Sequence, residues 1–540
     1  MQHNQHIAEL GILLESRGIR HAIIAPGSRN APLIQLFTGN KAFISHSIVD
    51  ERSAGYVALG MARELKEPVV LVTTSGTAVL NLSPAVAEAF HQHIPLVVLT
   101  ADRPLEKISR FNNQVINQTA PYFNHSRGFL ELPFEFRTES ELKQAFLSVG
   151  QLLDEALVPE TGPVHVNIPL LEPLYEPLPS ALKQVSVSVN PGTQNVEFPV
   201  FDKGLATKKI MLLAGMGNYG KEIEPLLRDL SSRYELLVVA ENIANLASGQ
   251  FVVNPELVLA GSGEAERDQL APDVLISFGG QVVSKRLRLF LESLQELEHI
   301  EIKENIRESL KRMFASGDEG DRIIQNHLQE TWKRIESREA QRAVSYIQGA
   351  PFSNLSVIHK VLSLVPAHST VHLGNSSVIR YSQLFPGRDD LSYYSNRGTS
   401  GIDGSLSTAV GAAMVSDELH LLLLGDLSFV YDSNALWNKN FPPNLKIVVI
   451  NDGGGGIFRL LEGPERMEFF EEFSVTHHPV SLELLSQSFG REFRRAVSMD
   501  EVTRDAMALF HPDSSLSILE VDTTKSENSR TFKEFFNQNQ

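Results

Sequence analysis

The sequence contains no cysteine and is poor in basic residues. Its 540 residues include 48 Lys and Arg against 65 Asp and Glu, which gives a formal net charge of −17. The absence of cysteine excludes disulfides, thiolate metal sites and cysteine nucleophiles. Because non-specific nucleic-acid binding requires clustered Lys and Arg, the acidic balance argues against a nucleic-acid partner.

Long apolar runs are also missing. No stretch approaches the ~20 apolar residues that a membrane helix needs, so no membrane span is expected. The N-terminal MQHNQHIAEL has no basic segment followed by an apolar core, so no signal peptide is expected. With the lack of cysteine, this favours a cytoplasmic protein. A hydrophobic content of 42% with 21% charged residues is ordinary for a soluble globular protein.

What the sequence does contain is a regular alternation of short apolar runs and helical patterns. In the first third, the expected strands are His21–Ala25, Val69–Thr73, Leu96–Thr100 and Val164–Ile168, with helices such as Glu51–Leu65 and Ala78–His91 between them. Further along, the expected strands are Lys209–Leu213, Leu236–Ala240, Leu257–Ala260, Val274–Phe278, Thr370–Leu373, His420–Leu424, Lys446–Ile450 and Leu516–Val521. Such alternation is typical of parallel α/β sheets.

Two breaks divide this pattern into three parts. Six prolines between residues 169 and 199 predict a linker. The middle part ends in a charged helical stretch, Glu304–Gln341, and Gln348–Phe352 is a short break after it. We therefore expect three α/β domains with parallel sheets, over residues 1–180, 200–340 and 350–540.

Two acidic residues in the last third stand directly after expected strands. Asp426 follows LLLLG and Asp452 follows KIVVIN, and the offset of 26 residues from one to the other suits a strand, a crossover and a parallel return strand. Both carboxylates would then lie at the same edge of the sheet, where open α/β sheets bind ligands. Glycines 453 to 456 let the backbone approach a phosphate. This combination predicts a site for Mg²⁺ and a diphosphate.

The same residues carry a resemblance to a known family. The GD and ND pairs resemble the GDG and NN motif of thiamine diphosphate enzymes, from which this chain departs at both ends. Together, the segments GDLSFVYDSNAL, GGGIF, SNRGTSGIDG, APGSRNAPL and TADRP are similar to one family of such enzymes. That family is the 2-succinyl-5-enolpyruvyl-6-hydroxy-3-cyclohexene-1-carboxylate (SEPHCHC) synthases of menaquinone biosynthesis. The matching segments run from Pro26 to Phe458, nearly the whole chain.

The resemblance implies a fold and a reaction. The fold would consist of three Rossmann-like parallel-sheet domains of the thiamine diphosphate enzyme type. The first, residues 1–180, would bind the pyrimidine; the second, residues 200–340, would be the central domain; and the third, residues 350–540, would bind the diphosphate and the metal. The reaction would be decarboxylation of 2-oxoglutarate and conjugate addition of the succinyl carbanion equivalent to isochorismate, a carbon transfer that gives SEPHCHC and CO₂. The cofactors would be thiamine diphosphate and Mg²⁺ or Mn²⁺. The protein would be a homodimer or homotetramer with active sites at the subunit interface.

The resemblance also assigns roles to single residues. Glu51 matches the catalytic glutamate that hydrogen-bonds the aminopyrimidine; without the resemblance, an acidic residue there would simply be a favourable charge at a helix start. The residues expected to line the substrate pocket are Ser28, Arg29, Arg103, Gln114, Lys285, Ser376, Arg380, Arg397 and Phe458. The residues expected to bind the cofactor are Glu51, Thr77, Ile402, Asp426, Leu427, Ser428, Asp452, Gly453, Gly454 and Ile457. Of these, Asp426, Asp452 and the Gly454 carbonyl would bind the metal.

Two other functions remain open. One is a different thiamine diphosphate carboligase or decarboxylase, which the several arginines argue against because small neutral 2-oxo side chains need no such cluster. The other is a dinucleotide-binding oxidoreductase. Its basis is GMGNYG (Gly215–Gly220) after an expected strand, with Glu241 21 residues beyond Gly220, which satisfies the fingerprint of a dinucleotide-binding unit.

Overall fold

The computed structural model describes residues 2–108, 113–156, 161–181, 208–219, 223–246, 249, 251–303, 305–314, 327–460 and 463–537. Their contacts divide the chain into two compact units. The first comprises residues 1–194, 398–417 and 432–442, and the second comprises residues 195–397, 418–431 and 443–540.

The described residues of the first unit form one six-stranded parallel sheet in the order β2-β1-β3-β4-β6-β5. Its strands are β1 His21–Ile24, β2 Ile44–Ser47, β3 Val69–Thr73, β4 Leu96–Asp102, β5 Gly128–Glu131 and β6 Val164–Pro169. Its helices are α1 Gln5–Ser16, α2 Ala31–Gly39, α3 Glu51–Leu65, α4 Thr77–Asn81, α5 Ser83–His91, α6 Glu139–Glu155, α15 Ser405–Ala413 and the short 3₁₀ helix η5 Ser433–Trp437.

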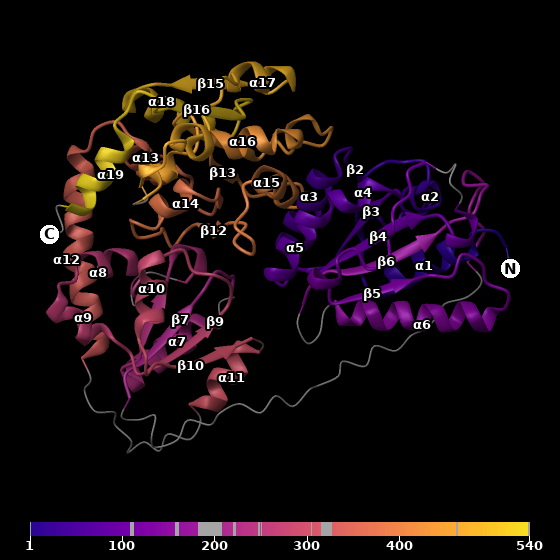
Figure 1. The fold of residues 1–540 in the computed structure, drawn as a ribbon, viewed down its shortest axis with the longest axis horizontal. Coiled ribbons are helices and arrows are strands. Elements are labelled where there is room, and N and C mark those ends of the chain that lie inside the picture. The colour runs from indigo at the N-terminus through magenta and orange to yellow at the C-terminus, as the bar shows by residue number, and fades with distance from the viewer. Residues whose placement is uncertain are drawn as a thin grey trace. The chain divides into compact units, whose positions relative to one another are not determined.

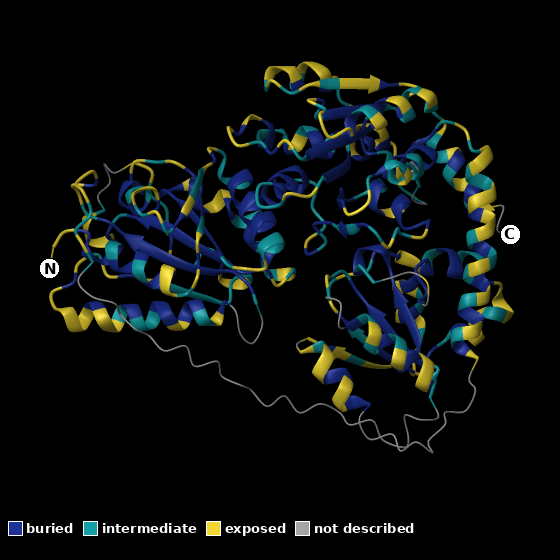
Figure 2. Ribbon diagram, turned by 180° about the vertical axis from the view of Figure 1, so that it is seen from behind, coloured by how far each residue is buried: buried dark blue, intermediate teal, exposed yellow. Residues whose placement is uncertain are grey.

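Helices cover this sheet, which is why its inner strands are buried and mostly apolar. Helices α1, α2 and α6 share one buried core with β1, β3, β4 and β6, and Figure 1 shows α6 running beside the sheet. Helix α3 packs against β1 and β3. Strands buried on both faces read as continuous apolar runs rather than alternating ones. In Figure 2 the inner strands are accordingly dark blue.

Helices α3 and α15 approach each other so closely that two positions require glycine. A Cβ on Gly60 would lie 1.9 Å from the carbonyl oxygen of Thr408, and one on Gly411 would lie 2.0 Å from that of Val57. Because no side chain tolerates such distances, glycine at both positions brings the two backbones into contact.

The described part of the second unit holds two further parallel sheets. The central sheet has the order β10-β9-β7-β8, with β7 Ile210–Ala214, β8 Leu237–Ala240, β9 Val274–Phe278 and β10 Glu298–Ile302. Separate buried cores line its two faces. The helices around it are α7 Ile223–Tyr234, α8 Pro255–Gly261, α9 Glu264–Leu270, α10 Lys285–Ser293, α11 Ile306–Met313 and α12 Leu328–Gly349.

The third sheet, described over six strands, has the order β12-β11-β13-β14-β16-β15. Its strands are β11 Thr370–Leu373, β12 Ser392–Tyr394, β13 His420–Gly425, β14 Leu445–Asn451, β15 Phe493–Ala496 and β16 Ile518–Asp522. Its helical segments are α13 Asn354–Leu364, α14 Ser377–Ser382, α16 Asp426–Tyr431, η6 Gly456–Leu460, η8 Glu471–Val475, α17 Leu482–Ser488, α18 Met499–Leu509 and α19 Asn528–Asn537.

These three parallel sheets with interleaved helices confirm the predicted fold class. The domain boundaries stay a prediction, since residues 182–199 of the expected linker and residues 200–207 after it lie outside the described residues. The same is true of residue 304 and residues 315–326 of the charged stretch. Each expected strand is present except Leu257–Ala260, for which the strand prediction was wrong. That run belongs to α8, where Pro255 occupies the first helical turn, a position proline favours.

Two other departures concern local geometry. The expected helix Ala78–His91 is two helices, α4 and α5, because Ser83 and Pro84 begin a new one. In the described part of the chain, the strands missed by the sequence are β2, β5, β10, β12 and β15, and each is an edge strand.

None of the helices in the described ranges is both long and apolar enough to cross a membrane.

Candidate active site

The carboxyl ends of β13 and β14 build the centre of the site in the second unit. These strands pair in parallel, with Gly425 opposite Ile450, so the chain after each strand emerges at one sheet edge, as predicted. Asp426 begins α16 and is only 1% exposed. Its Oδ2 accepts hydrogen bonds from the backbone N–H groups of Gly453 and Gly454, both at 2.9 Å. The glycine turn therefore wraps around the Asp426 carboxylate.

Asp452 is the second buried carboxylate at this edge. Its Oδ2 accepts a hydrogen bond from Nδ2 of Asn354 at 2.8 Å. Burial, followed by the negative charge of Asp426, raises the pKa of Asp452 to about 7. Burial also raises the pKa of Asp426. Two carboxylates that disfavour each other's charge form a site that a divalent cation would stabilise.

The turn after β14 can be built only from glycine. Gly453 has φ +82° and Gly454 has φ +146°, values that side-chain-bearing residues rarely adopt. A Cβ on Gly454 would also lie 2.4 Å from the carbonyl oxygen of Val475. The Gly454 carbonyl accepts a hydrogen bond from the N–H of Gly456 at 3.0 Å. The ND-GGGG sequence thus encodes a fixed backbone cradle.

Two histidines missed by the sequence reasoning support this cradle. His478 places Nε2 3.3 Å from Oδ2 of Asp426. His477 contacts the Gly453 carbonyl oxygen through Nδ1 at 2.7 Å and Glu471 through Nε2 at 3.0 Å. The spacing of the histidine pair carried no signal for this role.

Within the described residues, no cluster of three or more His, Asp and Glu side chains could hold a metal ion, so a metal here would need backbone or ligand oxygens as well.

Arg459 lies beside the cradle and is paired with Glu471. Its Nη1 and Nη2 donate to the two carboxylate oxygens of Glu471, at 2.8 and 2.6 Å. These hydrogen bonds from Arg459 hold the pKa of Glu471 below its usual value. Arg459 therefore tethers η6 to η8.

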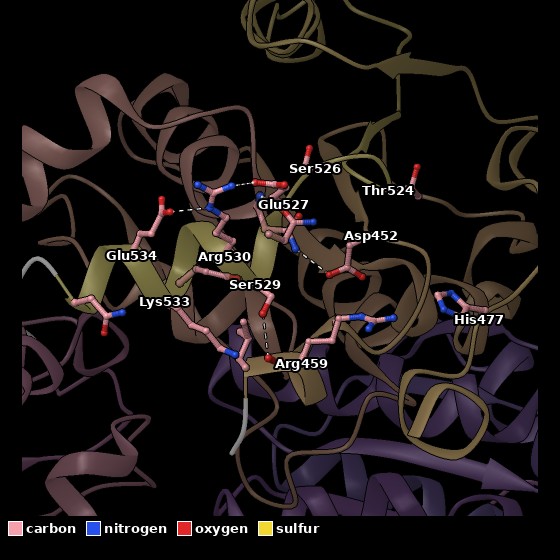
Figure 3. Close-up of a pocket in the computed structure, with 16 residues that line it drawn as sticks. Asp452, Arg459, His477, Thr524, Ser526, Glu527, Ser529, Arg530, Lys533 and Glu534 are labelled. Carbon is pink, nitrogen blue, oxygen red and sulfur yellow. Dashed lines mark hydrogen bonds and ion pairs between the residues drawn. The ribbon is translucent and has the colours of Figure 1, made fainter. Parts of the chain in front are cut away.

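A polar pocket of about 670 Å³ opens next to Asp452 (Figure 3). One wall is α19, on which Arg530 bonds to Glu527 and Glu534 at 2.9 and 2.8 Å. Ser529 Oγ donates to the carbonyl oxygen of Arg459 at 3.1 Å. The two arginines that line this pocket, Arg459 and Arg530, are thus already paired with acidic residues of the chain.

Ser376 and Arg380 lie together after β11. Ser376 has φ +76° and ψ −123°, a strained conformation for a residue other than glycine. Its carbonyl oxygen accepts a hydrogen bond from Nη1 of Arg380 at 2.6 Å. Burial lowers the pKa of Arg380. The strained turn therefore sets where this guanidinium lies.

Arg397 joins two loops of the second unit. Its Nη1 lies 3.4 Å from Oδ1 of Asn375, and its Nη2 lies 3.4 Å from the carbonyl oxygen of Val282. Lys285 follows Val282 by three residues, as the first residue of α10, and is exposed. The structure thus brings the β9–α10 loop to the guanidinium of Arg397.

Glu241 is the residue expected to bind the ribose of a dinucleotide, but its carboxylate is buried and bonds to the protein's own backbone. It is 2% exposed and accepts hydrogen bonds from the backbone N–H groups of Val283 and Ser284, at 2.5 and 2.7 Å. Burial raises its pKa to about 7. Glu241 therefore holds the chain just before Lys285.

The glycine turn of GMGNYG is likewise occupied by the chain itself. Tyr219 donates its hydroxyl to the Gly215 carbonyl oxygen at 2.6 Å, and Asn245 Nδ2 donates to that of Gly217 at 2.8 Å. A Cβ on Gly215 would lie 1.7 Å from the carbonyl oxygen of Gly280. Gly220 lies outside the described residues. The first two glycines therefore serve internal packing.

In the first unit, Glu51 and its neighbour Asp50 have distinct roles. Asp50 caps α3: its Oδ1 accepts from the N–H of Ser53 at 3.0 Å, and its Oδ2 accepts from Nδ2 of Asn434 at 2.5 Å. Glu51 is the first residue of α3, partly exposed, and its Oε2 accepts from Nδ2 of Asn81 at 3.1 Å. Asp50 is thus committed to the helix cap.

Arg103 and Gln114 meet near the carboxyl end of β4. Nη1 of Arg103 donates to the carbonyl oxygen of Gln114 at 3.3 Å and to Oγ of Ser75 at 3.4 Å. Gln114 has φ +58° and an exposed side chain. Gly76, at φ +87°, leads into α4, whose first residue Thr77 is exposed. These residues share one edge of the first sheet.

Ser28 and Arg29 follow β1 at the same edge. Ser28 is exposed, whereas Arg29 is 7% exposed. Nη1 of Arg29 donates to the Leu170 carbonyl oxygen and Nη2 to Oε1 of Glu172, both at 3.2 Å. Burial, followed by the positive charge of Arg29, lowers the pKa of Arg103. Two guanidinium groups therefore lie close enough to influence each other.

The remaining predicted cofactor contacts lie in loops and short helices. Ile402 precedes α15 and is partly exposed. Leu427 and Ser428 are in α16, with Ser428 4% exposed. Ile457 is buried and Phe458 is 38% exposed, both in η6.

Comparisons with known proteins identify the family. A family profile described as "Thiamine pyrophosphate enzyme, N-terminal TPP binding domain" matches residues 5–121. A 2-succinyl-5-enolpyruvyl-6-hydroxy-3-cyclohexene-1-carboxylate synthase of Desulfotalea psychrophila is 39% identical over 511 residues, which cover 93% of this chain and 95% of the relative. The chain belongs to the SEPHCHC synthase family.

Two other SEPHCHC synthases are similar over nearly their full length. That of Flavobacterium johnsoniae is 34% identical over 551 residues, and that of Flavobacterium psychrophilum is 35% identical over 554 residues. Each alignment covers 97% of this chain and 97% of the relative. The predicted family, and with it a thiamine diphosphate enzyme of the transferase type, is confirmed.

Proposed function

We propose that this chain joins 2-oxoglutarate to isochorismate with loss of CO₂, giving SEPHCHC for menaquinone biosynthesis. The observation that carries this proposal is the buried pair Asp426 and Asp452 around a glycine cradle, on a chain that belongs to the SEPHCHC synthase family. Bound thiamine diphosphate supplies the electron sink that the decarboxylation requires.

The metal would be Mg²⁺ or Mn²⁺, held by Asp426, Asp452 and the carbonyl oxygen of Gly454. The residues suit this role because both carboxylates are buried with raised pKa values, a charge imbalance that a divalent cation would relieve. Mg²⁺ is usually held by one or two carboxylates together with phosphate oxygens. Two carboxylates and one carbonyl leave coordination positions for a diphosphate.

The diphosphate would lie against Leu427, Ser428 and Gly453, at the start of α16 and in the cradle. Ile457 and Ile402 would support the rest of the cofactor by apolar contact. Thr77 and Glu51 would face the pyrimidine, where the Glu51 carboxylate would accept and return a proton at the ring. The bonds of Asp50 to Ser53 and Asn434 support Glu51, rather than Asp50, as the proposed acid–base group.

The substrate residues would position carboxylates. Arg29, Arg103, Arg380 and Arg397 offer planar guanidinium groups that match a carboxylate with two parallel hydrogen bonds. Ser28, Gln114, Lys285 and Ser376 would add polar contacts, and Phe458 would cover an apolar part of a substrate. Orientation and charge stabilisation are what these residues contribute to the rate.

The assembly would be a homodimer or homotetramer in the cytoplasm, with active sites at the subunit interface. Residues 1–180, 200–340 and 350–540 would act as pyrimidine-binding, central and diphosphate-binding domains. The family membership supports this arrangement.

The test is 2-oxoglutarate decarboxylation by the purified protein, with and without thiamine diphosphate, Mg²⁺ and isochorismate, with product mass as readout. We expect turnover only with all four components and a product carrying the succinyl group. Turnover of pyruvate in place of 2-oxoglutarate would instead identify another thiamine diphosphate carboligase, and product formation without thiamine diphosphate would refute the proposal.

A further inference from the structure

Glu88 is a fully buried carboxylate in an apolar helix, and the sequence analysis did not single it out. It lies in α5 with 0% exposure. Its Oε1 accepts hydrogen bonds from the N–H of Gly398 at 2.7 Å and from Nε2 of Gln92. Its Oε2 accepts from the N–H and the hydroxyl of Thr399, at 2.6 and 2.5 Å. Buried carboxylates are rare unless their oxygens are satisfied, so these four donor groups account for its presence.

The bonded segment leads directly to Ile402. Gly398 packs on α5 so closely that a Cβ there would lie 2.8 Å from the Glu88 carbonyl oxygen. Residues 398–404 form no regular helix or strand, and Ser400 has φ +61°. At the far end, the Tyr56 hydroxyl donates to Oδ2 of Asp403 at 3.1 Å. Glu88 and Tyr56 thus fix the two ends of an irregular segment with Ile402 between them.

We propose that Glu88 is a positioning residue for the cofactor, acting through Ile402. By fixing the backbone at residues 398 and 399, it sets where the Ile402 side chain lies. This inference rests on the proposed contact of Ile402 with thiamine diphosphate. Glu88 itself has no role in bond making, since its oxygens are taken by Gln92 and by the segment that it holds.

The variant Glu88→Gln tests this inference with little change in shape. One acceptor oxygen becomes an NH₂ group, which cannot accept from a backbone N–H and so repels one of its present partners. We expect thiamine diphosphate affinity, measured by calorimetry with Mg²⁺ present, to fall at least about tenfold, the size of a lost hydrogen bond to a charged group. Unchanged affinity would overturn the inference.

A double-mutant cycle with Ile402→Ala separates positioning from general support of the fold. If Glu88 acts through Ile402, adding Glu88→Gln to Ile402→Ala should change thiamine diphosphate affinity by less than about twofold. A full tenfold loss on top of Ile402→Ala would show that Glu88 acts elsewhere and would overturn the proposal.

Thr399→Val provides a milder variant should Glu88→Gln fail to fold. It removes only the hydroxyl donor and leaves both backbone bonds to Glu88. We expect a smaller loss of affinity that likewise disappears in the Ile402→Ala background, and persistence of the loss there would contradict the proposal. Because the readout is cofactor binding without 2-oxoglutarate or isochorismate, it stays valid even if the proposed reaction proves wrong.

Discussion

The carboxylate of Asp426 accepts a hydrogen bond from the backbone N–H of Gly453 at 2.9 Å, which links the ends of two neighbouring strands. The same oxygen accepts from Gly454 at the same distance. The cradle therefore depends on the acid at its centre, and the acid is held where a metal and a diphosphate would bind.

Replacing Asp426 should remove metal-dependent cofactor binding. Asp426→Ala deletes one proposed metal ligand and removes an acceptor from two glycine N–H groups, of which Gly453 keeps a bond to Oδ1 of Asn451. We expect calorimetry to detect no Mg²⁺-dependent binding of thiamine diphosphate. Asp500→Ala, at an exposed position at the start of α18, serves as the control and should bind normally. Near-normal binding by Asp426→Ala would refute the metal assignment.

Glu51 should be catalytic, whereas Asp50 should be structural. Glu51→Gln keeps size and helix propensity and loses the charge, so thermal stability should be unchanged while the rate falls at least ~10²-fold. Asp50→Ala removes the helix cap and should lower the free energy of unfolding by about 1 kcal/mol. Rate measurements with thermal melts distinguish the two. A Glu51→Gln enzyme within a few-fold of wild-type activity would remove Glu51 from the mechanism.

The sequence predicted interior strands better than edges, for a physical reason. Interior strands such as β3 and β14 are buried on both faces and contain runs of apolar residues, so their signal is strong. Edge strands such as β2, with the sequence ISHS, carry polar residues and resemble loops. The helix α8 was mistaken for a strand because a short apolar run fits both periodicities.

The site was predictable where strand ends and glycines define it, and not where distant side chains complete it. Asp426 and Asp452 follow from the strand pattern alone. Their partners Asn354 and His478 come from other segments of the chain, and only the fold reveals them. The same holds for Glu241, whose place after a strand suggested a ribose contact until the structure showed its backbone partners.

The GMGNYG turn should bind no dinucleotide. Tyr219 and Asn245 already bond to carbonyl oxygens of its glycines, and Glu241 is committed to backbone N–H groups. Equilibrium titrations of NAD, NADP and FAD should show nothing tighter than millimolar, a range typical of weak contacts. A micromolar dissociation constant for any of the three would overturn this prediction.

Glu241 should make stability depend on pH. Its pKa rises from 4.5 in the unfolded chain to about 7 on burial, so the folded protein binds the extra proton between these values. Its contribution to stability is therefore complete below pH ~4.5 and is lost as the pH rises through 7. Glu241→Gln lacks this titration.

The measurement is the denaturant midpoint of wild type and Glu241→Gln at pH 5, 6, 7 and 8. The difference in the free energy of unfolding should shift in favour of the variant as the pH rises, by at most about 1.4 kcal/mol per pH unit. Glu308→Gln, on the exposed surface of α11, should leave the wild-type pH dependence unchanged. A constant difference between Glu241→Gln and wild type would show that Glu241 stays ionised throughout.

Arg397 should bind a substrate carboxylate and leave the cofactor site intact. Neutral oxygen acceptors from Asn375 and Val282 orient its guanidinium, both at 3.4 Å. Removing an arginine from a buried charge pair leaves its partner unpaired, which costs roughly 2–5 kcal/mol. Arg397→Ala should therefore raise the Michaelis constant of a substrate, lower kcat, or both, while thiamine diphosphate affinity stays within a few-fold.

Two further variants sharpen this test. Arg397→Lys should restore activity only in part, because a point charge cannot reproduce a two-pronged contact. Arg312→Ala, which removes an exposed arginine of α11 paired with Glu308, controls for the loss of one positive charge and should leave the kinetics unchanged. If Arg397→Ala instead loses thiamine diphosphate binding and keeps its substrate constants, the guanidinium serves the diphosphate, and the proposed division between cofactor and substrate residues is wrong.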